Sequence, residues 1–316
     1  MYGAGAPSVI AIVIVNYHLC QEVMGCLDSI EQHVPGDRCE VIVVDNGSTD
    51  PERETLRARI GVHDHWQYID PGENLGFGAA SNLGANASTA PWICFLNPDT
   101  VVEDDVFRCL IEVAESRDAA VVGPAYGPAG WLEWHSGRFP GLVLESLSIA
   151  MLGRPVEALW MGLRRRLGGE RPLPVDWILG ACMMLPRQWF DRSGGFDESF
   201  FLYYEEMDLC RRIRDAGGHI LLAPTCRLQH IGSVSGKRDY RAFTRRFFEG
   251  KLHYLYKHHR GFMGSLMRAI VWLQLQFQRL LWRLPPFSAD PRATAKLSGV
   301  ADVLASLRSG FPWEVR

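Results

Sequence analysis

The chain has 316 residues, of which 47% are hydrophobic, and it carries a formal net charge of -3. This composition excludes wholesale disorder, and the length suits one large α/β domain with an appendage, or two small domains. The slightly acidic balance argues against a general nucleic-acid-binding protein, so no nucleic-acid partner is expected.

The charge is unevenly distributed along the chain. One basic cluster contains Arg164, Arg165, Arg166 and Arg171, and a second covers residues 238–283. Such clusters leave room for a local partner that carries phosphate groups, or for an anionic membrane surface.

The 8 cysteines are scattered and form no Cys-x-x-Cys pair. They are Cys20, Cys26, Cys39, Cys94, Cys109, Cys182, Cys210 and Cys226. Because several lie in apolar runs, we expect buried free thiols in a reducing cytosol, and neither a disulfide framework nor a zinc site. The apolar stretch at residues 9–15 has no basic flank and no cleavage site, so we interpret it as a first core strand and not as a signal peptide.

Strands and helices are expected to alternate over the first 120 residues. Apolar runs predict strands at residues 9–15, 40–44, 67–69 and 92–96. Helical spacing predicts helices at residues 21–33, 51–59 and 104–116, and one that opens at the glycine-rich segment 72–78 and ends near residue 88. This alternation with short turns predicts a doubly wound, mostly parallel sheet flanked by helices.

The pattern changes after residue 119. We expect strands and loops at residues 123–141, an amphipathic helix or helix pair at 142–167 with a break at 153–155, and an apolar segment at 175–185. The second half of residues 191–216 and most of residues 238–284 have helical spacing.

Residues 262–284 are apolar but are interrupted by several arginines and glutamines, which a membrane-spanning helix should not carry. A helix lying in the membrane interface, with Trp272, Phe277 and Trp282 at headgroup depth, suits the segment better. The alternative is a packed C-terminal helix or an oligomer contact. Residues 142–167 could form a second membrane contact.

Polar clusters follow three of the predicted strands. They are Asn16, residues 45–50, and residues 97–99. Since ligands bind outside the carboxyl ends of the strands in open α/β sheets, these clusters are expected to line one shared site. The plainer interpretation of each cluster alone is a turn or a helix N-cap.

Three constellations indicate chemistry. The glycine-rich segment 74–82 could bring backbone N–H groups and the amides of Asn74 and Asn82 toward a nucleotide, although it lacks the full dinucleotide or Walker pattern. The oxygen-rich segment Asn97-Pro98-Asp99 suits a hard divalent ion that also holds substrate phosphates, with His230 as a possible further ligand.

The third constellation is acidic. Glu205, Glu206 and Asp208 lie at an expected helix start, where the helix dipole alone explains acidic residues. Their mutual repulsion should also raise at least one pKa and produce a general base. On the acceptor side of the site, Trp177 and Gly180 belong to the expected apolar segment, and the ring of Trp177 could stack on a sugar.

Five segments, in the expected order over about residues 9–235, resemble motifs of the inverting family 2 glycosyltransferases, which have the GT-A fold. Within that family they are most similar to the bacterial rhamnosyltransferase group. The segments are Ile14-Val-Asn-Tyr17, Val43-Val-Asp-Asn-Gly-Ser-Thr-Asp50, Asn74-Leu-Gly-Phe-Gly78, Phe95-Leu-Asn-Pro-Asp-Thr100 and Gly195-Phe-Asp-Glu-Ser-Phe-Phe-Leu-Tyr-Tyr-Glu-Glu-Met-Asp-Leu-Cys210.

The resemblance implies roles in donor binding. Asp45 would contact the nucleotide base, and four further residues would shape the nucleotide pocket. These four are Asn16, Asp50, Asn74 and Gly76.

The resemblance also implies a metal ion and a base. Asn97-Pro98-Asp99 occupies the family's Asp-x-Asp position, so Asp99, with His230, would hold Mg²⁺ or Mn²⁺ on the donor diphosphate. The amide of Asn97 replaces the first acid, which lowers the charge of the site. Glu205-Glu206 matches the family's Glu-Asp pair, whose second member is the base. This assigns the base to Glu206, one methylene longer than the family's aspartate, and Glu205 or Asp208 could share the role.

The expected function is therefore inverting transfer of a sugar, L-rhamnose from dTDP-rhamnose, to a lipid-linked acceptor such as a polyprenyl diphosphate, or to a polysaccharide of the cell envelope. The expected location is cytoplasmic and peripheral at the inner face of the membrane, and a homo-oligomer is possible. Residues 1–235 would form the GT-A domain, with a nucleotide-sugar half at about 1–120 and an acceptor half at about 121–235. Residues 236–316 would form a helical extension.

Alternative functions remain open at this stage. The same fold could use a UDP- or GDP-sugar. A nucleotidyltransferase would want a basic glycine-rich loop after the first strand, where Val15-Asn-Tyr-His18 stands instead. A catalytically silent nucleotide-sugar-binding scaffold is suggested by Asn97 and by the glutamate at position 206.

Overall fold

The computed structural model describes residues 10–36, 38–127, 136–231 and 239–309. The expected domain boundary at residues 235–236 lies outside these ranges, as do parts of the expected segments 9–15 and 123–141. The division of the chain into domains stays a prediction.

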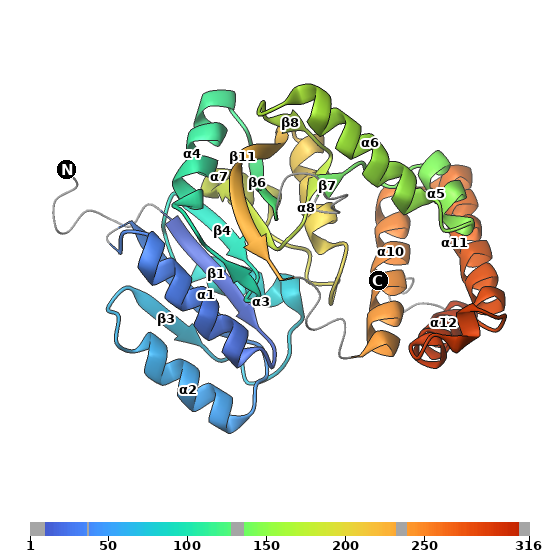
Figure 1. The fold of residues 1–316 in the computed structure, drawn as a ribbon, viewed down its shortest axis with the longest axis horizontal. Coiled ribbons are helices and arrows are strands. Elements are labelled where there is room, and N and C mark those ends of the chain that lie inside the picture. The colour runs from blue at the N-terminus through green and yellow to red at the C-terminus, as the bar shows by residue number, and fades with distance from the viewer. Residues whose placement is uncertain (1–9, 37, 128–135, 232–238, 310–316) are drawn as a thin grey trace.

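The first hundred residues alternate between strands and helices, as the sequence predicts (Figure 1). The elements are β1 (Ile10–Asn16), α1 (Cys20–His33), β2 (Cys39–Asp45), α2 (Asp50–Ile60), β3 (Trp66–Ile69), α3 (Phe77–Asn86), β4 (Trp92–Leu96) and β5 (Thr100–Val101). Every residue of β1 is buried, because helices cover both faces of the sheet at this point.

The middle of the chain contains the remaining strands. Its elements are α4 (Val106–Arg117), β6 (Val121–Tyr126), β7 (Ser136–Gly137), α5 (Leu142–Ile149), α6 (Gly153–Gly168), β8 (Leu173–Pro174), β9 (Trp177–Ile178), β10 (Cys182–Pro186), α7 (Arg187–Ser193), α8 (Glu205–Asp215) and β11 (Ile220–His230). The expected helix pair is confirmed as α5 and α6.

The main sheet has the strand order β3-β2-β1-β4-β10-β6-β11-β5, with β8 paired to β11. Strands β3, β2, β1 and β4 run parallel to one another, and β6 is parallel to β11. Strand β10 runs antiparallel to both β4 and β6. Helices α1, α2 and α4 pack on one face and α3, α7 and α8 on the other, so the expected doubly wound α/β architecture is confirmed.

The C-terminal part of the described chain is helical, as expected. It contains α10 (Tyr240–His258), α11 (Gly261–Leu281), a short 3₁₀ helix (Phe287–Ala289) and α12 (Ala293–Ser309). These helices share a third apolar core with Phe200, which precedes α8, so the helical extension is packed onto the sheet domain. Within the described ranges no helix is long and apolar enough to cross a membrane.

One expectation about the cysteines is wrong. Cys109 on α4 and Cys226 on β11 form a disulfide, with their Cα atoms 5.6 Å apart, although 117 positions separate them. Strand β11 lies beside α4 in the fold, which a scan for short cysteine spacings does not detect. The other six cysteines are free thiols, and all but Cys20 are buried, as expected.

Candidate active site

The carboxyl ends of β1, β2 and β4 meet at one edge of the sheet, and the expected polar residues lie there. Asn16 is paired in register with Asp45 at the ends of β1 and β2. The Asn16 amide donates to Asp45 Oδ1 at 3.3 Å and to Ser48 Oγ at 2.7 Å. The Tyr68 hydroxyl donates to Asp45 Oδ2 at 2.6 Å. Both oxygens of a fully buried carboxylate are therefore held in place.

Burial and the hydrogen bond to Asp45 raise the pKa of Tyr68, so its hydroxyl stays protonated and remains a donor. This fixes the orientation of the Asp45 carboxylate at the mouth of the strand pair. A carboxylate fixed in this way is suited to reading the N–H edge of a nucleotide base.

A second polar group lies at the start of α3. Asn46 donates to Asn74 Oδ1 at 2.9 Å and to the carbonyl of Gly76 at 3.2 Å, and its own Oδ1 accepts from the backbone of Leu75 at 2.8 Å. Gly76 has φ +86°, and a Cβ there would lie 2.4 Å from the carbonyl oxygen of Phe201. The loop is therefore built around a glycine and closed by asparagine amides.

Two other expected residues, Asp50 and Asn82, make different contacts from this group. The side chain of Asp50 is 93% exposed at the start of α2, and its ion-pair partner among the described residues is Arg53 at 3.9 Å. Asn82 bonds to both backbone groups of Phe196 and to Glu198, so its amide braces the turn before α8 and does not face the nucleotide pocket.

Asp99 and His230 lie together, as expected for a shared ligand pair. His230 Nε2 is 3.2 Å from Asp99 Oδ1, and both side chains are at least 90% buried. The pairing of β5 with β11 places them there, since His230 is in register with Thr100. No group of three or more His, Cys, Asp or Glu side chains in the described ranges could hold a metal ion. Two protein ligands suit a hard divalent ion such as Mg²⁺ or Mn²⁺, which keeps several non-protein ligands.

Asn97 connects this pair to the segment that contains Gly180. Its backbone N–H donates to the carbonyl of Ala181 at 2.9 Å, which ties the end of β4 to the segment before β10. A Cβ at the neighbouring Gly180 would lie 3.8 Å from Glu206 Cβ and 3.4 Å from the ring of Phe77. Gly180 therefore leaves room beside Glu206.

The acidic cluster begins α8 after two tyrosines in left-handed conformation, Tyr203 at φ 70° and Tyr204 at φ 74°. Glu205 and Glu206 are both buried, and among the described residues Oε2 of each has no hydrogen-bond partner. Burial and the charge of Glu206 raise the pKa of Glu205 well above its ordinary value. Burial raises the pKa of Glu206 to about 7, against backbone hydrogen bonds that lower it.

Asp208 has a different environment. Arg212 Nε donates to it at 2.8 Å, and Lys257 Nζ and His258 Nε2 each lie 2.7 Å from its Oδ1. Burial raises the pKa of Asp208, but the hydrogen bond from His258 and the charge of Arg212 outweigh it and the net shift is downward. This carboxylate joins α8 to α10 and is poorly suited to accept a proton.

Trp177 is 6% exposed and belongs to the core, with its Nε1–H donating to the carbonyl of Arg138 at 3.1 Å. Its ring therefore presents no free face for a sugar in this structure. Sequence reasoning missed Asn46, Ser48 and Tyr68, which hold the expected residues in place. Asn46 and Ser48 stand in the quoted motif itself, whereas Tyr68 comes from the neighbouring strand β3 and carries no local signal.

The fold is that of a GT-A glycosyltransferase: a doubly wound sheet with Asn16, Asp45, Asp99 and two buried glutamates at one edge. Residues 11–194 match the family model described as glycosyl transferase family 2. The chain belongs to this family.

Curated relatives of the chain include rhamnosyltransferases. It is 28% identical over 243 residues to the N-acetylglucosaminyl-diphospho-decaprenol L-rhamnosyltransferase of Mycobacterium tuberculosis, covering 72% of this chain and 78% of the relative. It is 26% identical to the rhamnosyltransferase WbbL of Escherichia coli, covering 76% of this chain and 89% of that protein.

Solved structures share the fold. A mannosyltransferase from Pyrobaculum calidifontis in complex with GDP-Man and Mn²⁺ superposes with a TM-score of 0.57 at 19% identity, covering 98% of this chain and 84% of the other. GalNAc-T7 with UDP, GalNAc and Mn²⁺ superposes with the same TM-score at 14% identity, covering 98% of this chain and 59% of the other.

Proposed function

We propose that this glycosyltransferase transfers L-rhamnose from dTDP-rhamnose, with inversion, to a lipid-linked or polysaccharide acceptor of the cell envelope. The observation that carries the reaction type is the buried Oε2 of Glu206, which has no hydrogen-bond partner among the described residues. It lies beside Gly180, next to the turn that holds Asp99. The choice of sugar and acceptor is supported by the rhamnosyltransferase relatives.

The proposed roles in donor binding follow from where the residues lie. Asp45, oriented by Tyr68, binds the nucleotide base, and Asn16, Asn74 and Gly76 shape the pocket around it. Asp50 stays a prediction as a further pocket residue, although its side chain is exposed.

Asp99 and His230 would hold Mg²⁺ or Mn²⁺, which offsets negative charge on the departing diphosphate. Glu206 takes the proton from the acceptor hydroxyl as that oxygen bonds to the anomeric carbon and the carbon–diphosphate bond breaks. A single base suffices because attack is direct and no glycosyl-enzyme bond forms. The pKa of about 7 keeps Glu206 ready to accept a proton near neutral pH.

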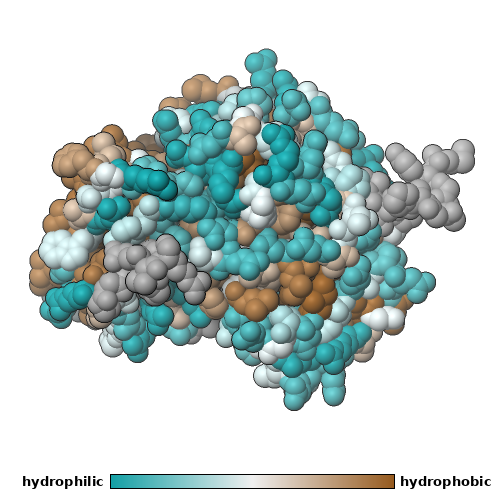
Figure 2. Space-filling model, turned by 180° about the vertical axis from the view of Figure 1, so that it is seen from behind, coloured by the Kyte–Doolittle hydropathy of each residue, from teal (hydrophilic) through white to brown (hydrophobic). Residues whose placement is uncertain are grey.

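The proposed setting is cytoplasmic, with the C-terminal helices in contact with the inner membrane face. Exposed apolar side chains on α11 support this: Phe262 is 82% exposed, Leu280 58% and Trp272 47%. Figure 2 shows apolar side chains gathered at the end of the molecule formed by α5 and α11. Such a contact would bring a polyprenyl-linked acceptor to the site.

A thermal-shift screen of nucleotide-sugars tests the donor. A ligand that binds only the folded chain raises Tm by mass action, and dTDP-rhamnose with Mn²⁺ should give the largest rise. If a UDP- or GDP-sugar gives a larger rise in Tm, that sugar is the donor and the proposed reaction is otherwise unchanged. A metal-dependent rise without any turnover would instead support a binding scaffold.

The first prediction concerns the base. Glu206→Gln keeps the shape of the side chain but cannot accept a proton, so transfer should fall by about 100-fold or more while the donor-induced Tm rise survives. Glu112→Gln on the exposed side of α4 is the matched control and should retain full activity. Normal transfer by the Glu206 variant together with a silent Glu205→Gln variant would move the base to Glu205.

A further inference from the structure

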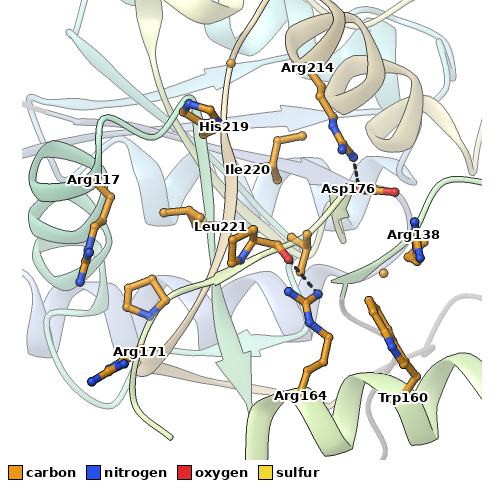
Figure 3. A pocket seen from close by; sticks show the side chains of 15 residues that line it. Arg117, Arg138, Trp160, Arg164, Arg171, Asp176, Arg214, His219, Ile220 and Leu221 are labelled. Carbon is orange, nitrogen blue, oxygen red and sulfur yellow. Dashed lines mark hydrogen bonds and ion pairs between the residues drawn. The ribbon is translucent and has the colours of Figure 1, made fainter. Parts of the chain in front are cut away.

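An open cavity of about 660 Å³ lies at the start of β11, where Ile220 and Leu221 line it (Figure 3). Strand β11 runs in the same direction as β4, whose carboxyl end lies at the candidate active site. The start of β11, and the cavity beside it, therefore lies at the opposite edge of the sheet. Strand β11 bulges between Ala223 and Arg227, so Ile220 and Leu228 are matched to Val121 and Tyr126 of β6. Five strand residues span about 17 Å, and His230 lies two residues further along β11. The cavity is therefore separate from the nucleotide and metal positions.

The cavity is strongly basic. Its lining contains five arginines, which come from α4, α6, α8 and two connecting segments: Arg117, Arg138, Arg164, Arg171 and Arg214. Asp176 is the one carboxylate of the lining, and it is paired with Arg214, as Figure 3 shows. In the described part of the chain, the guanidinium groups of the other four form no ion pair with a carboxylate, although Glu157 Oε1 accepts from the backbone N–H of Arg138 at 2.8 Å. A phosphate group, with its several oxygens and negative charge, matches such a set of guanidinium groups.

Two of these arginines are held beside an aromatic ring. The guanidinium of Arg164 lies 4.6 Å from the ring of Trp160, and that of Arg138, which comes from a connecting segment, lies 5.6 Å from the same ring. Arg164 also donates to the carbonyl of Pro174 at 2.9 Å, which fixes its position at the cavity wall. The basic wall is thus partly ordered before any ligand binds.

The helix that carries Arg164 and Trp160 also exposes an apolar stripe to solvent. Val156 is 43% exposed, Leu159 68%, Leu163 54% and Leu167 80%, at a spacing of three or four residues on α6. A site for free phosphate would need no such stripe. Basic groups beside exposed leucines and a tryptophan are typical of a helix that lies in the interface of an anionic bilayer.

We propose that the basic cavity binds the phosphate group of an anionic phospholipid, with the exposed stripe of α6 inserted among the neighbouring lipids. The proposal goes beyond glycosyl transfer and does not depend on the identity of the donor. It also places the site relative to the membrane. Arg214 and Glu206 lie eight residues apart on α8, so about 12 Å separates them along the helix axis.

The test is co-sedimentation of the full chain with phosphatidylcholine vesicles, with and without added phosphatidylglycerol. The double variant Arg164→Gln/Arg171→Gln should bind the anionic vesicles about tenfold or more weakly, because each basic group near the surface contributes to the attraction. The double variant Arg108→Gln/Arg192→Gln removes the same charge from α4 and α7 outside the cavity, and it should lose clearly less.

Two further measurements separate the sources of phosphate. Leu159→Gln/Leu163→Gln changes only exposed positions and should also weaken vesicle binding, which keeps the test valid if the arginine variant unfolds. Equal binding of the wild type to neutral and anionic vesicles would refute the proposal. So would a Tm rise with inorganic phosphate alone that the arginine variant loses, if the leucine variant bound vesicles normally. Transfer to a water-soluble acceptor should be unchanged in all three double variants, so this test stands apart from that of the proposed function.

Discussion

Glu206 is a buried carboxyl group that no described side chain neutralises, and this determines its titration. Burial raises its pKa to about 7 from an ordinary value of 4.5. If Glu206 is the base, the rate of transfer should rise with pH up to about 7 and then level off, because only the deprotonated form accepts a proton. Initial rates at low acceptor concentration between about pH 5 and 9 measure this. A flat profile across pH 7 would contradict the assignment.

The same shift affects stability with a defined sign. The folded-state pKa is higher than the unfolded one, so the neutral carboxyl stabilises the fold and that contribution is lost as pH rises through about 7. Glu206→Gln stays neutral, so its free energy of unfolding should exceed that of the wild type by about 1–3 kcal/mol at pH 8. The two proteins should be nearly equal at pH 4, and urea unfolding at both pH values checks this.

The Asp99–His230 pair gives a separate prediction at the same scale. Asp99→Asn keeps the size of the side chain but removes the charge, so the part of the donor-induced Tm rise that depends on Mn²⁺ should disappear. Asp104→Asn, an exposed change in the loop that follows, should leave that rise intact. An unchanged Mn²⁺ dependence in the Asp99 variant would place the metal ion elsewhere.

Local sequence predicts single residues well where a polar group directly follows an apolar strand. Asn16, Asp45 and Asp99 lie where the strand pattern predicts, because parallel strands bring their carboxyl ends to one edge. The partners of these residues are less predictable. Tyr68 reaches Asp45 from another strand, and Lys257 reaches Asp208 from a helix much further along the chain. Only the packed structure shows that Asp208 is held by cations and that Glu206 is not.

At the scale of elements, α10 determines how α8 is presented to the site. Tyr203 and Tyr204 turn the chain into α8 with positive φ, and Gly250 of α10 packs against that turn. A Cβ at Gly250 would lie 2.3 Å from the carbonyl oxygen of Tyr203. The close approach leaves no room for any other residue.

Gly250→Ala should therefore force α10 away from α8 and reduce the free energy of unfolding by about 1–3 kcal/mol. Gly25→Ala is the matched control, since Gly25 is also in a helix but a Cβ there would have no neighbouring atom within 4 Å. That control should stabilise the chain by about 0.5–1 kcal/mol. Urea unfolding of both variants measures the difference, and equal effects would show that the contact is not tight in solution.

Periodicity predicts most elements of the chain to within a few residues, because buried strands and amphipathic helices have distinct apolar spacing. Strand β4 begins and ends where the apolar run does. Helix α5 ends at Ile149 and α6 begins at Gly153, so the break lies just before the expected residues 153–155, which form the first turn of α6. The direction of β10 could not be predicted in this way. It pairs antiparallel to two strands, and its apolar run has the same composition in either direction.

At the scale of the whole molecule, the C-terminal helices have two distinct faces. The inner face of α11 contributes Met267, Val271 and Leu275 to the third core. The outer face exposes Phe262, Trp272 and Leu280. Deleting the helix would remove core side chains together with the exposed ones, so point substitutions on the outer face are the sharper test of its role.

Trp272→Gln/Leu280→Gln removes apolar area from the outer face and leaves the core intact. If this face lies in the membrane interface, binding to vesicles should weaken several-fold, since it scales with buried apolar area, and the Tm should stay within about 2 °C of the wild type. If the face is instead the contact of a homo-oligomer, size-exclusion chromatography in the absence of lipid should show the variant dissociating while vesicle binding is unchanged. When these changes are combined with Leu159→Gln/Leu163→Gln on α6, the losses in the free energy of vesicle binding should add, because two separate patches that contact one bilayer contribute independently.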